Sequence, residues 1–485
     1  MSKESRVVII GAGFAGLTAG KRLREQGIVP IVLEARERVG GRVYTTPYVD
    51  GKPLNLGASV IIGTEGNRLT ELAASINARL EPLGDNKYLA RPGQPALSDE
   101  ECERIAEAVD DAFDAIKEQV ASSASIDERA NVADAVYANL RAAVAEEPDL
   151  DYEVLRCAAD ALSEDYAAEI ANVSLRHVSV IKDNGGDDSI VVEGFRPLLR
   201  AAAGDDVIQS VLLEHVVTRI DYTGSSVRVV TANHGDFIAE AVLVTVPLGV
   251  LKARDIVFEP PLSADRQLSI DRVGFGLLDL VVLDYSNLSE PFWPDCNQFT
   301  TLQPDNVRHD PQYASDLLPR DAMCFVNYHY INGRLLLVAY VVCELAKRLE
   351  AMSDNEVASL FGRHLKCYFP DAKQTRPCRA TLGRWWNNPF SRGSYTYIAV
   401  GGDPADFSVL ATPCHAVAGS SQPEATDTIT SSSAAGAAKS MLFWAGEHTV
   451  RERHSYADGA WASGERAADE ITRYLHERKH HAVTQ

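Results

Sequence analysis

Three glycines near the beginning of the chain, Gly11, Gly13 and Gly16, constrain the fold more than any other feature of the sequence. They follow the apolar run RVVII and precede a helical pattern at 15–27, after which 28–35 forms a second apolar run. Strand, glycine turn, helix and strand make a βαβ unit. The first glycine permits the tight turn, the second lets a pyrophosphate approach the backbone, and the third lets helix and strand pack closely. The pattern predicts a dinucleotide site at the N-terminus of the helix.

The residues at the end of the second strand narrow the choice of nucleotide. Glu34 stands where a carboxylate accepts hydrogen bonds from both ribose hydroxyls and repels a 2′-phosphate, which favours FAD or NAD over NADP. Arg36, Gly41 and Arg42 follow at once. Arg42 can reach a pyrophosphate and Arg36 can flank the adenosine. These additional contacts favour FAD over NAD.

Length, charge and cysteine usage exclude several classes of protein. The 485 residues predict about two to four domains, and the hydrophobic content of 46% excludes a largely disordered chain. The formal net charge of −21 argues against nucleic-acid binding and against docking on anionic membranes, and it mildly favours cationic ligands. The eight cysteines have no metal-ligand spacing, so we expect no metal site and reduced thiols in the cytoplasm.

The pattern of the remaining chain suggests an interrupted organisation. Residues 99–182 are rich in Ala and charged residues, which predicts an insertion of several helices. We expect a hairpin at 227–247 that ends in an apolar strand, and mainly strands over 256–345. The stretch 401–440 is rich in small polar residues and is expected to be a flexible surface loop, and 459–478 is expected to be the last helix.

Motifs spread over nearly the whole chain occur together, among them VVIIGAGFAGLTAGKRL, VLEARERVGGRVYT, VLVTVPLGVL and AGEHT followed by GAWASGERAA. In this combination the chain resembles the flavin-dependent amine oxidase family of monoamine oxidases, polyamine oxidases and lysine-specific histone demethylases. The resemblance implies a mixed α/β fold with two discontinuous, interleaved domains. The implied parts are a Rossmann-like FAD-binding domain from 1–82, 188–255 and 380–478, a substrate-binding domain of mixed sheet and helices from 83–187 and 256–379, and a tail at 479–485.

The same resemblance implies which residues contact the cofactor. A second strand, glycine turn and helix near the end of the chain would make a second anion site, with Glu447 at the start of the last helix. The implied contacts are Gly11, Gly13, Gly16, Glu34, Arg36, Gly41 and Arg42 for the ADP part, Gly57, Ala58 and Ser59 near the flavin ring, Val217 at the adenine, Gly446 and Glu447 near the ribityl chain and pyrophosphate, and Trp385, Phe390, Ser455 and Tyr456 beside the flavin or substrate.

Five positions bear on the chemistry that the resemblance implies. Tyr395 and Tyr456 match the two tyrosines that enclose the amine in monoamine oxidases, and Trp385 matches a residue beside the flavin. Aromatic faces attract a neutral or cationic amine by van der Waals contact and cation–π interaction. Ser394 stands where monoamine oxidases carry the cysteine that tethers FAD, which implies non-covalent FAD. Leu280 stands where relatives usually carry a lysine near flavin N5, which puts rapid use of O2 in question.

The implied function is FAD-dependent oxidation of the C–N bond of a small-molecule amine, such as a polyamine, an arylalkylamine or a secondary amine. Hydride transfer to flavin N5 would give an imine, and O2 would take the electrons to give H2O2. Leu280 keeps open a desaturase, an oxidative cyclase or a dehydrogenase on the same fold, and a flavin-bound protein without turnover is a third alternative. A histone tail is disfavoured because the demethylases carry a further chromatin-binding module. We expect a monomer or homodimer in the cytoplasm, with no nucleic-acid and no membrane partner.

Overall fold

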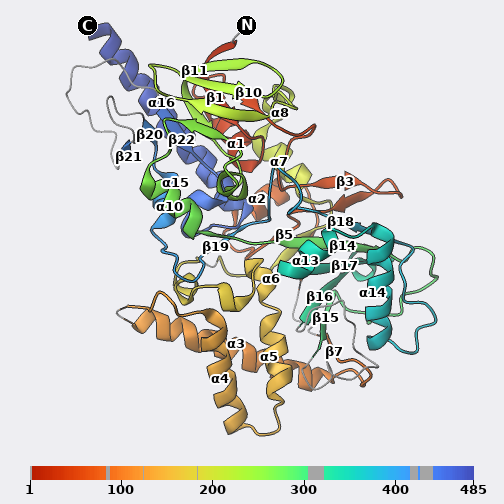
Figure 1. The fold of residues 1–485 in the computed structure, drawn as a ribbon. Coiled ribbons are helices and arrows are strands. Elements are labelled where there is room, and N and C mark those ends of the chain that lie inside the picture. The colour runs from red at the N-terminus through yellow and green to blue at the C-terminus, as the bar shows by residue number, and fades with distance from the viewer. Residues whose placement is uncertain are drawn as a thin grey trace.

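A nine-stranded sheet forms the upper part of the molecule in Figure 1. The computed structural model describes residues 3–83, 88–123, 125–182, 184–303, 322–415, 424–425 and 441–484. The long strand β11 lies at the centre of the sheet, parallel to β1 on one side and to β22 on the other. The strands are β1 (Lys3–Ile10), β2 (Ile31–Leu33), β9 (Val217–Asp221), β10 (Val227–Thr231), β11 (Asp236–Val244), β12 (Val257–Glu259), β20 (Cys414–His415), β21 (Glu424–Ala425) and β22 (Met441–Trp444).

Successive side chains of the central strands point to opposite faces of this sheet, and both sets are buried, as expected for parallel strands that are covered on two sides. In β1, Val7 and Ile9 join one apolar cluster, whereas Val8 and Ile10 join the other. The helices of the first face are α1 (Phe14–Glu25), α2 (Arg68–Ser75), α7 (Phe195–Ala203), α8 (Asp205–Gln209) and α16 (Ala457–Thr484), and those of the second are α9 (Leu248–Lys252), α10 (Ala264–Arg272) and α15 (Asp406–Ala411).

A second sheet of six strands lies beside the first part, in the order β18-β14-β17-β16-β15-β7. One face of β14 packs under α13 and α14, and its other face, which includes Leu280, points toward a smaller apolar cluster. The elements are β7 (Tyr88–Ala90), β14 (Leu278–Asp284), β15 (Gln298–Leu302), β16 (Ala322–Asn327), β17 (Leu336–Val342), β18 (Arg379–Leu382), α12 (Tyr328–Asn332), α13 (Cys343–Glu350) and α14 (Asp354–Tyr368).

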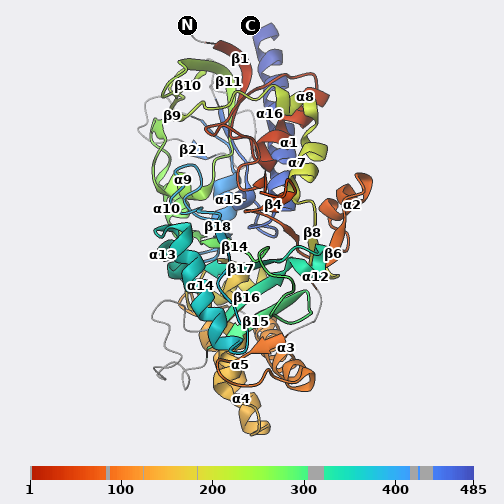
Figure 2. The same ribbon diagram turned by 90° about the vertical axis from the view of Figure 1, so that its right-hand side faces the viewer.

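The helical insertion lies at the end of the molecule opposite both termini (Figures 1 and 2). A capping box at Ser98 starts its longest helix, α3, because the Ser98 hydroxyl accepts from the N–H of Glu101 and the Glu101 carboxylate accepts from the N–H of Ser98. The helices enclose an apolar core of their own. They are α3 (Asp99–Ser122), α4 (Val132–Glu146), α5 (Tyr152–Asp160), α6 (Ser163–Tyr166), η1 (Ile170–Asn172) and η2 (Leu175–Ser179).

Short sheets join these parts. They are β3 (Thr45–Pro47) with β4 (Pro53–Asn55), β5 (Val60–Ile61) with β8 (Ser189–Val191) and β6 (Leu80–Pro82), and β13 (Gly274–Phe275) with β19 (Thr396–Tyr397). Strand β12 belongs to the larger sheet and β18 to the smaller one, so each lies just across a boundary predicted at 255 or 380. The domain boundaries themselves stay a prediction.

The expected mixed α/β class is confirmed, and two details differ from expectation. Helix α16 continues to Thr484, through almost all of the segment 479–485 that was predicted as a tail. The stretch 401–440 was predicted as a flexible surface loop, but it contains α15 and β20, because Phe407, Leu410 and Cys414 pack into the apolar cluster on the second face of the larger sheet. Its residues 416–423 and 426–440 lie outside the described residues. Among the described helices, none combines the length and apolar character that a membrane crossing needs. The described residues also contain no cluster of three His, Cys, Asp or Glu side chains suited to a metal ion.

Candidate functional site

A cavity of about 1220 Å³ lies where the larger sheet, the smaller sheet and the helical insertion meet. Small-molecule sites usually have volumes of roughly 300–1,000 Å³, so this cavity is large enough for a cofactor together with a substrate. All but one of the site residues expected from the sequence line it. They are Gly11, Gly13, Glu34, Arg36, Gly41, Arg42, Gly57, Ala58, Ser59, Val217, Leu280, Trp385, Phe390, Tyr395, Gly446, Glu447, Ser455 and Tyr456.

Gly16 is the expected cofactor residue that does not line the cavity, and its environment explains why. A Cβ atom on Gly16 would lie 2.0 Å from the carbonyl oxygen of Gly11, so this glycine lets α1 pack against the turn. Gly11 itself has φ +108°, a conformation that favours glycine. Gly13 caps α1 without a side chain, and a Cβ on Gly41 would lie 3.5 Å from the Gly13 Cα atom. The two glycine turns therefore form one cradle around the exposed N–H groups of α1, which suits a pyrophosphate.

Glu34 and Arg36 form the nucleotide end of the cavity. The Glu34 carboxylate accepts from the N–H of Ala12 at 2.8 Å and from the N–H of Arg36 at 3.0 Å. The Arg36 guanidinium lies over the ring of Phe390 and donates to Asn388, but its buried Nε has no hydrogen-bond partner. Burial lowers the pKa of Arg36 to about 10. An unsatisfied buried guanidinium N–H is costly, so this group fits an anionic or polar ligand such as the ADP part of FAD.

Arg42 and Glu447 connect the glycine cradle to the segment that follows β22. Arg42 Nη1 donates to Glu447 Oε1 at 2.8 Å and to the carbonyl oxygen of Ser394 at 2.7 Å. The other Glu447 oxygen accepts from the Thr396 hydroxyl at 2.6 Å and from the N–H of Ser455 at 3.1 Å. Burial opposes ionisation of Glu447, but Arg42 and the other donors outweigh it and lower the pKa of this carboxyl. Glu447 therefore remains an anion that anchors Arg42.

The placement of Glu447 in the chain differs from expectation. It opens the short helix η3 (Glu447–Thr449), and α16 begins only at Ala457. The turn between them brings Ser455, with φ +74°, and Tyr456 to the cavity wall. The second anion site is thus not a direct strand-to-helix turn like the first, because an intervening segment separates the glycine from the long helix.

Trp385 closes one side of the cavity. Its indole N–H donates to the carbonyl oxygen of Leu56 at 2.9 Å, and its backbone N–H donates to Asp279 at 3.2 Å. A Cβ on Gly57 would lie 3.0 Å from the indole ring and 2.1 Å from the carbonyl oxygen of Arg42. Only glycine fits at position 57, because a side chain there would collide with the Arg42 carbonyl and the Trp385 indole. The two hydrogen bonds of Trp385 fix its ring as a rigid surface of the cavity.

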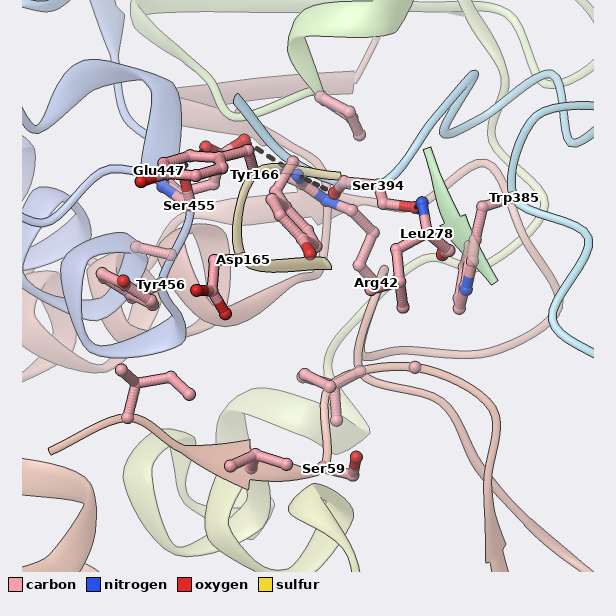
Figure 3. Close-up of a pocket in the computed structure, with 18 of the residues that line it drawn as sticks. Arg42, Ser59, Asp165, Tyr166, Leu278, Trp385, Ser394, Glu447, Ser455 and Tyr456 are labelled. Carbon is pink, nitrogen blue, oxygen red and sulfur yellow. Dashed lines mark hydrogen bonds and ion pairs between the residues drawn. The ribbon is translucent and has the colours of Figure 1, made fainter. Parts of the chain in front are cut away.

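Tyr395, Tyr456 and Asp165 meet in the same chamber. The Tyr395 hydroxyl donates to the carbonyl oxygen of Glu164, and Arg453 lies over the ring of Tyr456 at 4.3 Å. Burial raises the pKa of both tyrosines, so both hydroxyls stay protonated. Figure 3 shows the Asp165 carboxylate projecting into the open middle of the pocket beside Tyr456. Among the described residues, no side chain forms an ion pair with it.

Two adjacent carboxyls of α6 face this chamber, and sequence reasoning missed both. Burial raises the pKa of Glu164 to about 8, and burial together with the charge of Asp188 raises that of Asp165 to about 7. Asp165 is accessible, but the surface that it exposes lies in the cavity and is surrounded by protein. In the sequence these carboxyls resemble any acidic helix surface, and the segment 80–188 carries no recognised motif. No sequence pattern indicated that α6 points these carboxyls into the cavity.

Leu280 lies on the wall formed by the smaller sheet. Its side chain is 4% exposed and packs among apolar neighbours such as Leu56 and Val282. Across the strand pair it faces Tyr340, whose hydroxyl bonds to Ser59. Leu280 therefore presents an apolar side chain to this part of the wall, with the hydroxyl of Tyr340 on the neighbouring strand.

Ser394 has a structural role in the same region. Its hydroxyl donates to the carbonyl oxygen of Leu278 at 2.7 Å and accepts from the N–H of Leu278 at 2.9 Å. Among the described residues, Cys324 is the one cysteine that lines the cavity, and burial raises its pKa far above the usual thiol range. A neutral thiol is a poor nucleophile, which agrees with the expectation of non-covalent FAD.

Comparisons with known proteins agree with this geometry. Residues 14–472 match the family model described as flavin containing amine oxidoreductase. The chain is 28% identical to polyamine oxidase 4 and 30% identical to polyamine oxidase 5 of Oryza sativa subsp. japonica, over 97% of this chain and 89% and 88% of those proteins. It is 30% identical to lysine-specific histone demethylase 1 homolog 2 of Arabidopsis thaliana, over 96% of this chain and 58% of that protein.

A solved structure of a putrescine oxidase double mutant has the same fold, with a TM-score of 0.66 at 18% identity over 98% of this chain and 100% of the other. The glycine cradle, the unsatisfied Arg36 and the long cavity fit the cofactor that the matched family requires. The chain is an enzyme with FAD as its cofactor, and it belongs to the flavin containing amine oxidoreductase family.

Proposed function

We propose that the enzyme oxidises the C–N bond of a small-molecule amine to an imine, which water then converts to a carbonyl compound and a smaller amine. FAD held by the glycine cradle, Arg36 and Arg42 would supply the hydride acceptor, and O2 would take the two electrons and two protons to give H2O2. The observation that carries the proposal is the Asp165 carboxylate, which has no ion-pair partner among the described residues and projects into the chamber that Tyr395, Tyr456 and Trp385 line. A cationic amine is the ligand that such a chamber can stabilise.

Asp165 has two tasks in this proposal. As a carboxylate it attracts the ammonium form of the substrate. Because burial raises its pKa to about 7, Asp165 can also accept a proton near neutral pH and leave the amine with the lone pair that C–N oxidation needs. Glu164, its neighbour in the chain, has a pKa that burial raises to about 8, so it is mostly protonated at neutral pH and Asp165 carries the charge.

Tyr395 and Tyr456 orient the substrate. The bond from the Tyr395 hydroxyl to the backbone of α6 fixes this ring relative to Asp165. Arg453 covers one side of Tyr456 and is neutralised by Asp458 at 2.9 Å, so the other side is left for the amine. Two fixed rings exclude water and hold the reacting carbon in place. Holding the reactants in the reacting geometry lowers the entropic part of the barrier.

The test is anaerobic reduction of the flavin by an amine panel, followed by admission of air. We expect one class of amine to bleach the flavin absorbance, and peroxide to form when the colour returns. The panel holds polyamines, as suggested by the relatives named polyamine oxidase, together with arylalkylamines, secondary amines and amino acids. If no amine bleaches the flavin of the correctly folded protein, amine oxidation is wrong and a binding role without turnover takes its place.

Asp165→Asn tests the role of the carboxylate. For a substrate that stays cationic between pH 6 and pH 9, as roughly set by the usual amine pKa, the KM of the wild-type enzyme should fall as pH rises through about 7. The variant should lose that dependence and have a KM at least about tenfold higher at pH 8. Glu169→Gln is the control, because Glu169 is exposed and lies outside the cavity.

Leu280 supports a second candidate, a dehydrogenase, desaturase or oxidative cyclase on the same fold. Its position is apolar in this chain, whereas the family resemblance implies that relatives usually carry a lysine there. For such an enzyme the bleached flavin would recolour slowly in air and quickly with an artificial electron acceptor.

The wider setting is also a proposal. The net charge of −21 supports an enzyme without a nucleic-acid or anionic membrane partner. None of the eight cysteines, all of which lie in the described part of the chain, forms a disulfide bond, which supports a reducing compartment that we take to be the cytoplasm. We further propose that FAD is bound non-covalently and that the enzyme is a monomer or homodimer.

A further inference from the structure

A tyrosine hydroxyl lies on the cavity wall beside Leu280. Tyr340 is the cross-strand partner of Leu280 in the antiparallel pair of β14 and β17. Directly opposite residues of such a pair share one face of the sheet and have Cβ atoms about 4.5–5.5 Å apart. Both side chains line the cavity. The apolar side chain of Leu280 is therefore accompanied by a hydrogen-bonding group on the next strand.

The same face of the smaller sheet continues away from Leu280 with neutral polar side chains. The register of β16 with β17 places Cys324 beside Tyr340, and Cys324 pairs in turn with Thr300 of β15. Both also line the cavity. Because β17 is the cavity-side neighbour of β14 in the strand order, Tyr340 is the member of this row that lies next to Leu280.

Ser59 contacts the Tyr340 hydroxyl from a different segment of the chain. The buried Ser59 is fixed by its backbone, because its carbonyl oxygen accepts from the N–H of Val191 at 2.9 Å. Burial raises the pKa of Tyr340 well above its ordinary value, and the hydrogen bond with Ser59 opposes that rise. Such opposition is expected when the serine donates and the phenol oxygen accepts. The contact then orients the phenol and leaves its hydrogen for an acceptor in the cavity.

The groups around Tyr340 are neutral at pH 7. Burial raises the pKa of Glu164 to about 8 and that of Cys324 far above the usual thiol range. Both neighbours contribute to the raised pKa of Tyr340, so its hydroxyl stays protonated. An oxygen atom that gains negative charge beside Tyr340 would meet a hydrogen-bond donor there. In a site closed to water, such a contact stabilises charge more than it does in solution.

We propose that Tyr340 is a further catalytic residue, whose hydroxyl, oriented by Ser59, donates a hydrogen bond to the negative charge that develops on O2. The inference rests on the proposed use of O2 and on the family resemblance, which implies that Leu280 and Ser59 lie near the flavin. Conversion of O2 to H2O2 takes two electrons and two protons. The electrons and one proton come from the reduced cofactor and the other proton from water, so Tyr340 is not consumed. A donor fixed where charge develops lowers the barrier.

The first experiment measures reoxidation without any amine. The FAD-loaded enzyme is photoreduced anaerobically with EDTA as the electron donor and is then mixed with air-saturated buffer. We expect the rate constant for recolouring of Tyr340→Phe to be at least about tenfold below that of the wild type. Tyr285→Phe is the matched control, because Tyr285 is buried in the smaller-sheet core, bonds to Thr375 and does not line the cavity. Equal rates for Tyr340→Phe and the wild type would overturn the inference.

Ser59→Ala tests the orientation of the phenol. We expect it to slow recolouring about threefold in the wild-type background, as for the loss of one neutral hydrogen bond. In the Tyr340→Phe background it should have no further effect, because Ser59 acts through Tyr340. The same loss in both backgrounds would overturn the part assigned to Ser59. If Tyr340→Phe did not retain flavin, an unchanged rate in Ser59→Ala alone would overturn the inference.

A third measurement needs no turnover. The FAD-loaded enzyme is labelled with 3-fluorotyrosine, and the Tyr340→Phe and Tyr285→Phe variants assign two 19F resonances by their absence. We expect the Tyr340 resonance to shift when the bound cofactor is photoreduced anaerobically, and the Tyr285 resonance to stay where it is. A Tyr340 resonance that is indifferent to the redox state of the cofactor would overturn its placement beside the reacting centre.

The proposed function and the role of Tyr340 fail separately. If no amine bleaches the flavin but Tyr340→Phe slows recolouring of the photoreduced enzyme, amine oxidation is wrong and the role of Tyr340 stands. If an amine bleaches the flavin and Tyr340→Phe recolours at the wild-type rate, amine oxidation stands and the role of Tyr340 is wrong.

Discussion

Arg42 and Glu447 form a buried ion pair, with Nη1 and Oε1 2.8 Å apart, between segments separated by 405 positions in the chain. The Glu447 side chain is 4% exposed and that of Arg42 is 23% exposed. The pair joins the turn at Gly41 to the segment that follows β22, so it links the glycine cradle to the Glu447 side of the cavity. Because Glu447 also accepts from Thr396 and Ser455, the carboxylate is satisfied only when all three donors are in place.

Arg42→Ala should therefore destabilise the enzyme strongly. Removal of one partner leaves a buried charge without compensation, which costs about 3 kcal/mol of unfolding free energy. The folded-state pKa of Glu447 is lowered, so its stabilising contribution is present above the unfolded pKa and is lost as pH falls through the folded pKa. The difference in unfolding free energy between variant and wild type, measured by urea denaturation, should then shrink in acid.

The control is Arg104→Ala, which removes one partner of an exposed ion pair and should cost less than about 1 kcal/mol of unfolding free energy. An equally small effect of Arg42→Ala would contradict the anchoring role.

Gly16→Ala should prevent formation of the nucleotide site. The added Cβ would lie 2.0 Å from the carbonyl oxygen of Gly11, which is backbone and cannot yield without moving the turn. We expect purified protein with little or no flavin, as measured by the ratio of flavin to protein absorbance. We also expect a lowered midpoint of thermal unfolding. Gly224→Ala is the control, since its nearest neighbour atom would lie 3.7 Å away and its backbone conformation is open to alanine. Full flavin content in the Gly16 variant would show that the turn tolerates the shift.

The nucleotide half of the cavity could be predicted from the sequence because its determinants are local. Gly11, Gly13 and Glu34 belong to one βαβ unit, so their spacing in the chain fixes their spacing in space. The positions of Tyr395 and Tyr456 followed from family resemblance, and the structure brings both to the cavity.

The substrate half could not be predicted in the same way. Asp165 reaches the cavity because α6, a helix of only four residues, turns back between the insertion and the smaller sheet. That turn depends on packing against β17 and η2, which involves contacts between distant segments rather than periodicity. Glu447 was wrongly expected at the start of the last helix for a related reason, because the segment from Glu447 to Tyr456 is ordered by tertiary hydrogen bonds and carries no helical pattern of its own.

Asp279 and Glu350 should make the Trp385 wall sensitive to alkaline pH. Glu350 accepts from the N–H groups of Trp386 and Asn387, both at 2.7 Å, and Asp279 accepts from that of Trp385. Burial and a hydrogen bond with Glu350 raise the pKa of Asp279 to about 8, so the Asp279 carboxyl keeps its proton at neutral pH. A raised pKa means that protonated Asp279 favours the folded state, and this stability is lost as pH rises through about 8.

The measurement is near-ultraviolet circular dichroism of the tryptophans. We expect the wild-type signal to change as pH rises through about 8, and Asp279→Asn to abolish that change because an amide does not titrate in this range. Asp284→Asn on the same strand is the control, since hydrogen bonds from Ser286 and Tyr48 outweigh burial and lower the pKa of Asp284. An alkaline transition that survives in the Asp279 variant would assign it to another group.

Leu280→Lys should speed reaction of the reduced enzyme with O2 and destabilise the fold. The resemblance to flavin-dependent amine oxidases implies that a lysine here assists flavin reoxidation, and Leu280 lines the cavity opposite Tyr340. The ammonium would enter an apolar cluster, and burial would lower the melting temperature by several degrees, as expected for the loss of about 2 kcal/mol or more.

Stopped-flow mixing of the reduced enzyme with air-saturated buffer should show recolouring at least about tenfold faster than in the wild type, because a tenfold change needs only about 1.4 kcal/mol of barrier. Leu280→Met keeps volume and polarity and should alter neither quantity much, since such swaps cost less than about 1.5 kcal/mol. Fast recolouring in the wild type, with no gain in the lysine variant, would mean that the hydroxyls of Tyr340 and Ser59 already suffice on this wall and that the enzyme is an oxidase without the lysine.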